Sequence, residues 1–198
     1  QVISGICLPG LALIEARVTG FKERMAELLP NVEVVGPLDV SFDQTENFAR
    51  WQEIVNNNPD ALAHVGFCEN DLPSLVRIKE NDANPDYEIM SIGINPDGLQ
   101  GIADGVALGA IGQKPFMQGY VAMRVMLEAL VSGEPAPRGW IDVQPEVVTI
   151  DNVEAVTARE ESLADGFEET QAYYQPEIDA IFADLPSQVQ SFGDLLGD

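Results

Sequence analysis

The sequence predicts an α/β fold built on a doubly wound parallel sheet, with an acidic helical extension at the carboxy terminus. Short apolar runs alternate five times with helical segments between residues 2 and 111. Because parallel strands need crossover connections, which are usually helical, this alternation predicts a parallel sheet. The last 48 residues differ, since they contain 12 acidic and one basic residue yet keep apolar positions at helical spacing.

The first two β/α units occupy residues 2–57. Val2 to Leu8 is an apolar run that ends at Pro9-Gly10, and residues 11–29 carry apolar side chains at helical spacing. Residues 32–40 have β-rich composition. The spacing of Phe48 and Trp51 predicts a helix over 44–57, which Asn58-Pro59 ends.

The remaining units predict strands at 61–67, 87–94 and 106–111, with helices at 71–81 and 96–104 between them. The strongest helix pattern in the chain follows at 116–131, and a Ser/Gly/Pro linker spans 132–137. Residues 140–150 are extended but contain Pro145. A proline there indicates an edge strand or a segment that crosses between two bodies, and argues against a central strand.

The chain is strongly acidic. It has 33 Asp and Glu residues against 10 Lys and Arg, which gives a formal net charge of -23. Such a chain repels phosphate backbones and anionic lipids, and it has no basic cluster with which to bind them, so we expect no nucleic acid partner. The first residues lack the basic and apolar stretches of a signal peptide, and no run of 18 apolar residues is present.

Cys7 and Cys68 are the only cysteines, and each ends a predicted buried strand. Two interpretations stay open. Both can be small apolar core residues. If their strands are neighbours in the sheet, the two sulfur atoms can instead come within bonding range, and an oxidising compartment would then favour a disulfide.

Candidate functional residues follow the strands, because open α/β sheets bind ligands beyond the carboxyl ends of their strands. Hydrogen-bonding groups alternate there with an aromatic ring, which suits a polyhydroxylated ligand. Catalysis is poorly served: the only histidine, His64, lies within a predicted strand, and no glycine-rich phosphate loop is present. The candidates are Arg17, Phe42, Asp43, Glu69, Asn70, Asp71, Asn95 and Gln113.

Each candidate also has a purely structural interpretation. Arg17 can be a surface cation, Phe42 a core residue and Gln113 a loop residue, while Asn70 and Asn95 can be helix N-caps. The acidic pairs 160–161 and 168–169 are expected to be solvated helix faces. We therefore expect no metal site and no cofactor.

The order and spacing of these residues resemble the second lobe of ribose-binding-like periplasmic binding proteins of type I, and the related LacI-type effector domains. The resemblance runs from Val2 to Val153. Its motifs are Arg17-Val18-Thr19-Gly20-Phe21, Phe42-Asp43-Gln44, Asn58-Pro59-Asp60-Ala61-Leu62-Ala63, Glu69-Asn70-Asp71, Ser91-Ile92-Gly93-Ile94-Asn95 and Gln113-Lys114-Pro115 followed by Gly119. It implies that Arg17, Asn70 and Gln113 bind sugar hydroxyls and that Phe42 packs against the sugar ring. Asn95 stands where the family usually has an aspartate, which leaves the identity of the sugar open.

The resemblance implies the substrate-binding component of an ABC sugar importer. Such a protein binds a monosaccharide or polyol between two lobes without catalysis and presents it to a membrane permease. It implies a periplasmic or extracytoplasmic location, with the signal peptide removed together with a missing first lobe. The expected parts are lobe two (1–113), a lobe-one remnant (114–145), a strand returning to lobe two (146–153) and the acidic tail (154–198).

Two alternative functions stay open, and the sequence also indicates a possible homodimer. The chain can be the effector domain of a LacI-type regulator, or an enzyme that uses Asp43, Glu69 and Asp71 as acid/base groups. The helix over 116–131, stripped of its lobe, would expose an apolar patch that could drive formation of a homodimer.

Overall fold

The computed structural model describes residues 1–164 and 166–193 and divides into two compact units. The first unit comprises residues 1–113 and 147–157, and the second comprises 114–146 and 158–198. The end of the expected acidic tail, residues 194–198, lies outside the described residues, as does residue 165.

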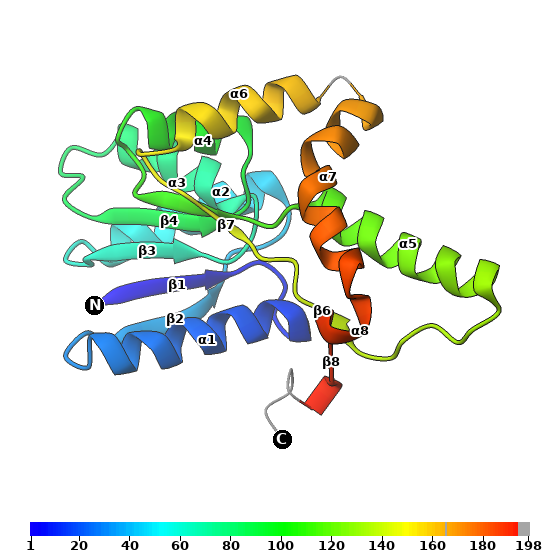
Figure 1. Cartoon of the computed structure of the whole chain (residues 1–198). Coiled ribbons are helices and arrows are strands. Elements are labelled where there is room, and N and C mark those ends of the chain that lie inside the picture. The colour runs from blue at the N-terminus through cyan, green and yellow to red at the C-terminus, as the bar shows by residue number, and fades with distance from the viewer. Residues whose placement is uncertain (165, 194–198) are drawn as a thin grey trace. The chain divides into compact units, whose positions relative to one another are not determined.

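The first unit contains a six-stranded sheet in the order β2-β1-β3-β4-β5-β7 (Figure 1). The pairs β1–β2, β1–β3, β3–β4 and β4–β5 are all parallel. The strands are β1 (Val2–Ile6), β2 (Val34–Asp39), β3 (Ala63–Gly66), β4 (Glu88–Ile92), β5 (Gly109–Gly112) and β7 (Glu146–Val148). The predicted α/β class with a parallel sheet is confirmed.

Helices connect the strands as the apolar spacing predicts. They are α1 (Ala12–Leu28), α2 (Gln44–Asn57), α3 (Asp71–Glu80) and α4 (Pro96–Ala103), and α6 (Val153–Leu163) follows β7. Because the chain steps from β1 outward to β2 and then back past β1 to β3, right-handed crossovers place α1 on one face of the sheet and α2, α3 and α4 on the other (Figure 1).

The strands β1 to β4 are shorter than their predicted ranges, and β5 departs most from its predicted start. We expected a strand at 106–111, but β5 begins at Gly109. The backbone N–H groups of Val106 and Ala107 donate to the Gly101 carbonyl and so close the end of α4. These two apolar residues therefore belong to the turn before the strand.

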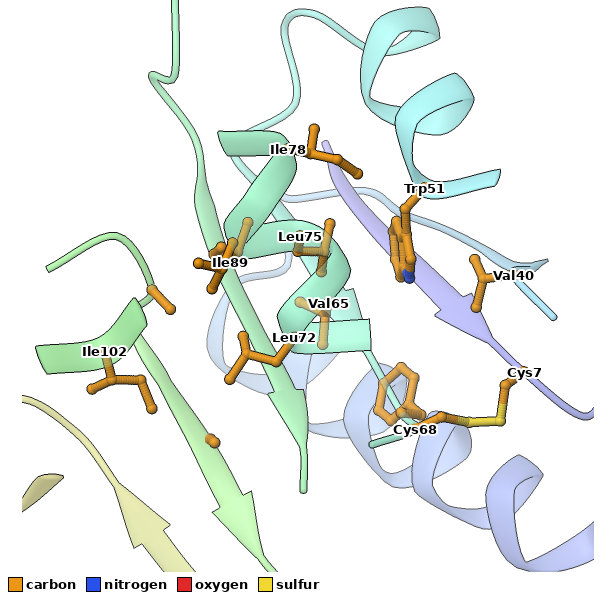
Figure 2. Packing of buried hydrophobic residues seen from close by; sticks show 14 of the residues in the cluster. Cys7, Val40, Trp51, Val65, Cys68, Leu72, Leu75, Ile78, Ile89 and Ile102 are labelled. Carbon is orange, nitrogen blue, oxygen red and sulfur yellow. A yellow bond between two sulfur atoms is a disulfide. The ribbon is translucent and has the colours of Figure 1, made fainter. Parts of the chain in front are cut away.

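The core of the first unit fills both faces of the sheet. Trp51, Leu72, Leu75, Ile89 and Ile102 are fully buried. Figure 2 shows Leu72 and Leu75 near Val65, and the Cys7–Cys68 bridge at one side of the cluster. At about 25 cal/mol per Å² of buried apolar surface, each such side chain contributes about 2 kcal/mol before the entropy cost of ordering it. This core holds the strand ends, and the loops that follow them, in fixed positions.

The second unit is mainly helical. It contains α5 (Pro115–Ser132), α7 (Phe167–Ala183), α8 (Leu185–Gln188) and a two-stranded antiparallel sheet of β6 (Trp140–Ile141) and β8 (Val189–Gln190). Tyr174, Ile178 and Ile181 of α7 form a small core with Met117 and Val121 of α5. The acidic segment thus packs on α5 with one apolar face, and Glu177 pairs with Lys114 at 3.0 Å.

Candidate ligand-binding site

The loop between β3 and α3, residues 67–70, lies at the centre of the candidate site. Parallel strands end at the same edge of a sheet, so the residues that follow β2, β3, β4 and β5 gather there. Side chains from neighbouring elements bond to three successive carbonyl groups of this loop: Arg17 to Phe67, Ser91 to Cys68 and Asn95 to Glu69. The loop is held rigidly, which favours binding without a large ordering cost.

Arg17 brings two parts of the site together. One guanidinium nitrogen donates to the Phe67 carbonyl at 2.9 Å, and another donates to Oε1 of Gln113 at 2.6 Å. The side chain is half-buried, and desolvation lowers the pKa of its guanidinium, which nonetheless stays charged because an arginine titrates far above neutral pH. Arg17 is therefore fixed against the sheet edge, unlike a solvated surface cation.

Phe42 and Asn70 are joined by a hydrogen bond in which Nδ2 of Asn70 donates to the Phe42 carbonyl at 2.8 Å. The Phe42 residue is 63% exposed, so the ring is not a core residue. Asn70 stands before α3 but makes no side-chain capping bond. Both side chains thus present groups at the edge that the local structure does not use: an aromatic face and an amide oxygen.

Asn95 is the N-cap of α4. Its Oδ1 accepts from the Gly98 N–H at 2.7 Å, and its Nδ2 donates to the Glu69 carbonyl at 2.9 Å. The amide keeps one N–H and one lone pair for a ligand. Asn95 therefore is a helix N-cap, as its structural interpretation predicted. Because both of its polar atoms already make a hydrogen bond, it has fewer free hydrogen-bonding positions for a sugar than an aspartate without such bonds would have.

Two of the three carboxylates of the enzyme alternative are occupied in the structure. Asp43 caps α2, because its Oδ1 accepts from the Thr45 and Glu46 N–H groups at 3.0 Å each. Asp71 is fully buried and accepts three hydrogen bonds. Among residues 1–164 and 166–193, no group of three His, Cys, Asp or Glu residues could hold a metal ion. Glu69 presents an exposed carboxylate at this edge, and Asp43 is also exposed although its Oδ1 is used as the cap of α2.

Cys7 and Cys68 form a disulfide with a Cα–Cα distance of 6.1 Å. They follow β1 and β3, which are neighbouring parallel strands, so the second of the two interpretations of the cysteines holds. The bond fixes the loop 67–70 from the side of β1. It also closes a loop of 61 residues, which restricts the unfolded chain.

Two features of the edge could not be predicted from the sequence. The first is the bond from Ser91 to the Cys68 carbonyl, and the second is a buried network of Asn47, Trp51 and Asp71. Their partners lie 20 to 24 residues apart, so no local pattern indicates them. A separate groove of about 510 Å³ lies along α2, α3 and α4, lined by residues that include Phe48, Arg77 and Gln100. None of the predicted ligand residues lines it.

The sequence profile of the periplasmic binding protein domain matches residues 8–135. The chain belongs to this family. No curated protein sequence matches the chain significantly. Among the described residues, no helix has the length and apolar character needed to cross a membrane.

Solved structures share the fold. An ABC transporter solute-binding protein from Burkholderia graminis, in complex with D-arabinose, has 24% identity and a TM-score of 0.68, over 76% of this chain and 53% of that one. A carbohydrate transporter solute-binding protein from Agrobacterium radiobacter, also with D-arabinose, has 20% identity and a TM-score of 0.70, over 79% and 52%. An ABC transporter solute-binding protein from Agrobacterium vitis, bound with α-D-tagatopyranose, has 20% identity and a TM-score of 0.69, over 79% and 53%. This chain therefore spans about half the length of each relative.

Proposed function

We propose that the chain forms the second lobe and a small part of the first lobe of a substrate-binding protein, which serves an ABC sugar importer and binds a monosaccharide or polyol between its two lobes without catalysis. The observation that carries the proposal is the convergence of all five predicted residues on the loop 67–70. Arg17 and Asn95 each donate to a carbonyl group of this loop, and Gln113 accepts from Arg17. Asn70 belongs to the loop and donates to the Phe42 carbonyl.

The chemistry of this edge supports a polyol. Arg17 keeps further N–H donors beyond its two bonds, Asn70 keeps an amide oxygen, and Phe42 offers an apolar ring. Sugar hydroxyls both donate and accept, and one face of a sugar ring is apolar, so this set complements both. The enzyme alternative has less support, because Asp43 and Asp71 are occupied by backbone and side-chain donors.

The proposed parts follow the expected division. Residues 1–113 and 146–153 form lobe two, 114–145 belong to lobe one, and 154–198 are an appended acidic segment. We expect the chain alone to bind sugar weakly or not at all, because one lobe would leave the ligand half solvated. The membrane permease of the importer is the proposed macromolecular partner. The Cys7–Cys68 disulfide supports an extracytoplasmic location, since such bonds persist in oxidising compartments.

We also propose that the isolated chain forms a homodimer through α5. Met123, Met126, Leu127, Leu130 and Val131 are all more than half exposed and recur along α5 at helical spacing. Met123 and Leu127 also line an apolar groove of about 490 Å³ with Phe116, Tyr120 and Phe167. The one acidic residue of this helix, Glu128, is paired with Arg124 at 2.8 Å. A second copy of an acidic chain can therefore approach this stripe with little charge repulsion.

The test of sugar binding uses the longer polypeptide that contains this sequence together with a first lobe. We expect a pentose, hexose or polyol to raise its melting temperature and not that of this chain alone. Phe42→Ala should raise the Kd about tenfold, because it removes an exposed ring that contributes to binding more than to folding. Leu62→Ala, another exposed apolar residue located before β3, is the matched control. Failure of every sugar to stabilise the two-lobed protein would sink the proposal.

A further inference from the structure

Asp71 places a buried carboxylate directly beneath the candidate site. The residue is fully buried, and its Oδ1 accepts from Nδ2 of Asn47 at 2.7 Å and from Nε1 of Trp51 at 3.0 Å. Its Oδ2 accepts from the Cys68 N–H at 2.9 Å. Burial raises the pKa of this carboxyl, while these three bonds act in the opposite direction. The donors come from two elements, since Asn47 and Trp51 belong to α2 and Cys68 to the loop after β3.

The sheet makes room for this network at two glycines. A Cβ atom at Gly66 of β3 would lie 2.2 Å from Cβ of Asp71. A Cβ atom at Gly5 of β1 would lie 2.3 Å from Cζ2 of Trp51. Both distances are far below contact, so any side chain at either glycine would displace the carboxylate or the indole. The network is therefore part of how β1, β3 and α2 pack together.

Asn47 extends the network to the loop that carries Phe42. Its Nδ2 also donates to the Ser41 carbonyl at 3.1 Å, so one amide group bridges Ser41 and Asp71. Oδ1 of Asn47 is buried without a hydrogen-bond partner among the described residues. Leaving a buried acceptor unpaired is costly, and an apolar residue of similar size would avoid that cost. An apolar residue could not, however, make the two hydrogen bonds that Nδ2 of Asn47 donates to Ser41 and Asp71.

We infer that Asp71 is a positioning residue for the proposed sugar site. Through the Cys68 N–H it fixes the loop 67–70, which carries Asn70, and through Asn47 it fixes the loop 41–43, which carries Phe42. The hydrogen bond from Asn70 to the Phe42 carbonyl also links these two loops directly. Asp71 and Asn47 are both buried, so they act on a ligand only through the spacing of these two loops. The role in sugar binding rests on the proposed function, whereas the coupling of the loops does not.

The coupling is tested on this chain by amide hydrogen exchange, read by NMR. We expect each of the variants Asp71→Asn and Asn47→Ala to lower the protection of at least one of two protons, the Trp51 indole N–H and the Cys68 amide N–H, about tenfold. We also expect each variant to shift the resonances of residues 41–43. Asn58→Ala is the matched control, because Nδ2 of Asn58 also donates to a backbone carbonyl, that of Ile54, at the other end of α2. If residues 41–43 respond no more to Asn47→Ala than to Asn58→Ala, the inference is wrong. Asn47→Ala keeps the test valid should Asp71→Asn fail to fold.

The effect on the ligand is tested in the two-lobed protein. We expect Asn47→Ala to raise the Kd for the sugar about tenfold, while Val55→Ala, a core truncation on the same helix, leaves it within about twofold. A purely structural role would lower stability in both variants and change the Kd in neither, which would overturn the inference. If the parent protein binds no sugar, the proposed function fails, and the exchange measurement still decides the coupling of the two loops.

Discussion

The two units of the chain differ in how completely they bury their apolar surface. The first unit closes a core on both faces of its sheet, with Trp51, Leu72, Ile89 and others fully buried. The core of the second unit has five buried members among the described residues, while Leu130 and Val131 of α5 are 76% and 89% exposed. A core of that size leaves a long helix half uncovered. We interpret the first unit as self-sufficient and the second as one that needs more protein around α5, in keeping with the proposed division into lobes.

The largest expected effect concerns the first unit. Replacing both Cys7 and Cys68 by Ala should destabilise this unit by about 4 kcal/mol, because the disulfide closes a loop of 61 residues. Chemical unfolding followed by hydrogen exchange would show the loss in the first unit and little change in the second. Dithiothreitol should reproduce the effect in the parent chain and add nothing in the variant. An unfolding midpoint that reduction does not move would contradict this account of the first unit.

The next largest effect is acid sensitivity, which is also expected in the first unit because His64 lies there. His64 is fully buried against the rings of Trp51 and Tyr87, and burial lowers the pKa of its imidazole from 6.5 to about 4. Between these pH values the unfolded chain binds a proton that the folded chain does not. The contribution of His64 to the free energy of unfolding is therefore fully present above pH 6.5 and is lost as the pH falls. At pH 4 the free energy of unfolding is lower by about 3 kcal/mol for this reason.

His64→Phe is the variant that isolates this effect, since an apolar ring cannot titrate. We expect its free energy of unfolding to fall less steeply than that of the parent chain between pH 6.5 and 4, as measured by urea unfolding at several pH values. Parallel pH profiles for the two proteins would mean that His64 is protonated in the folded state or plays no part in acid unfolding.

The smallest effect on stability is expected on α5 of the second unit. In the monomer, Leu130→Glu should change the free energy of unfolding by less than about 0.5 kcal/mol, because the side chain is largely exposed there. It should nevertheless convert a dimer of the parent chain into a monomer in sedimentation experiments. Leu13→Glu on α1, which replaces a leucine that is 64% exposed, is the control and should leave association unchanged. A parent chain that stays monomeric at every soluble concentration would show that the exposed stripe does not self-associate.

The fold was predictable because its signals are local. Apolar spacing gave α2 its ends at Gln44 and Asn57, and turn residues separated the strands. Strand β5 was predicted less accurately, because the backbone N–H groups of Val106 and Ala107 donate to the Gly101 carbonyl and not to a neighbouring strand. The run of apolar residues does not indicate these hydrogen bonds.

The candidate residues were also found locally, as polar groups after strands, but their connections were not. Arg17 and Gln113 are 96 residues apart in the chain, and Asn95 and Glu69 are 26 apart. Whether Asn95 caps a helix, binds a ligand or does both depends on its free hydrogen-bonding capacity, which only the folded arrangement determines. The Asn47–Asp71 bridge was missed for the same reason, because its geometry depends on glycines in two different strands.

We place the sugar or polyol at the carboxyl ends of the strands, around the loop 67–70. Titration of the two-lobed, ¹⁵N-labelled protein with the sugar that stabilises it best, with mapping of the amide and side-chain resonances that shift, would locate the ligand. We expect the largest shifts at Arg17, Phe42, Asn70 and Gln113. Shifts confined to the groove along α2, α3 and α4, around Phe48 and Arg77, would contradict this location and place the ligand on a different surface of the first unit.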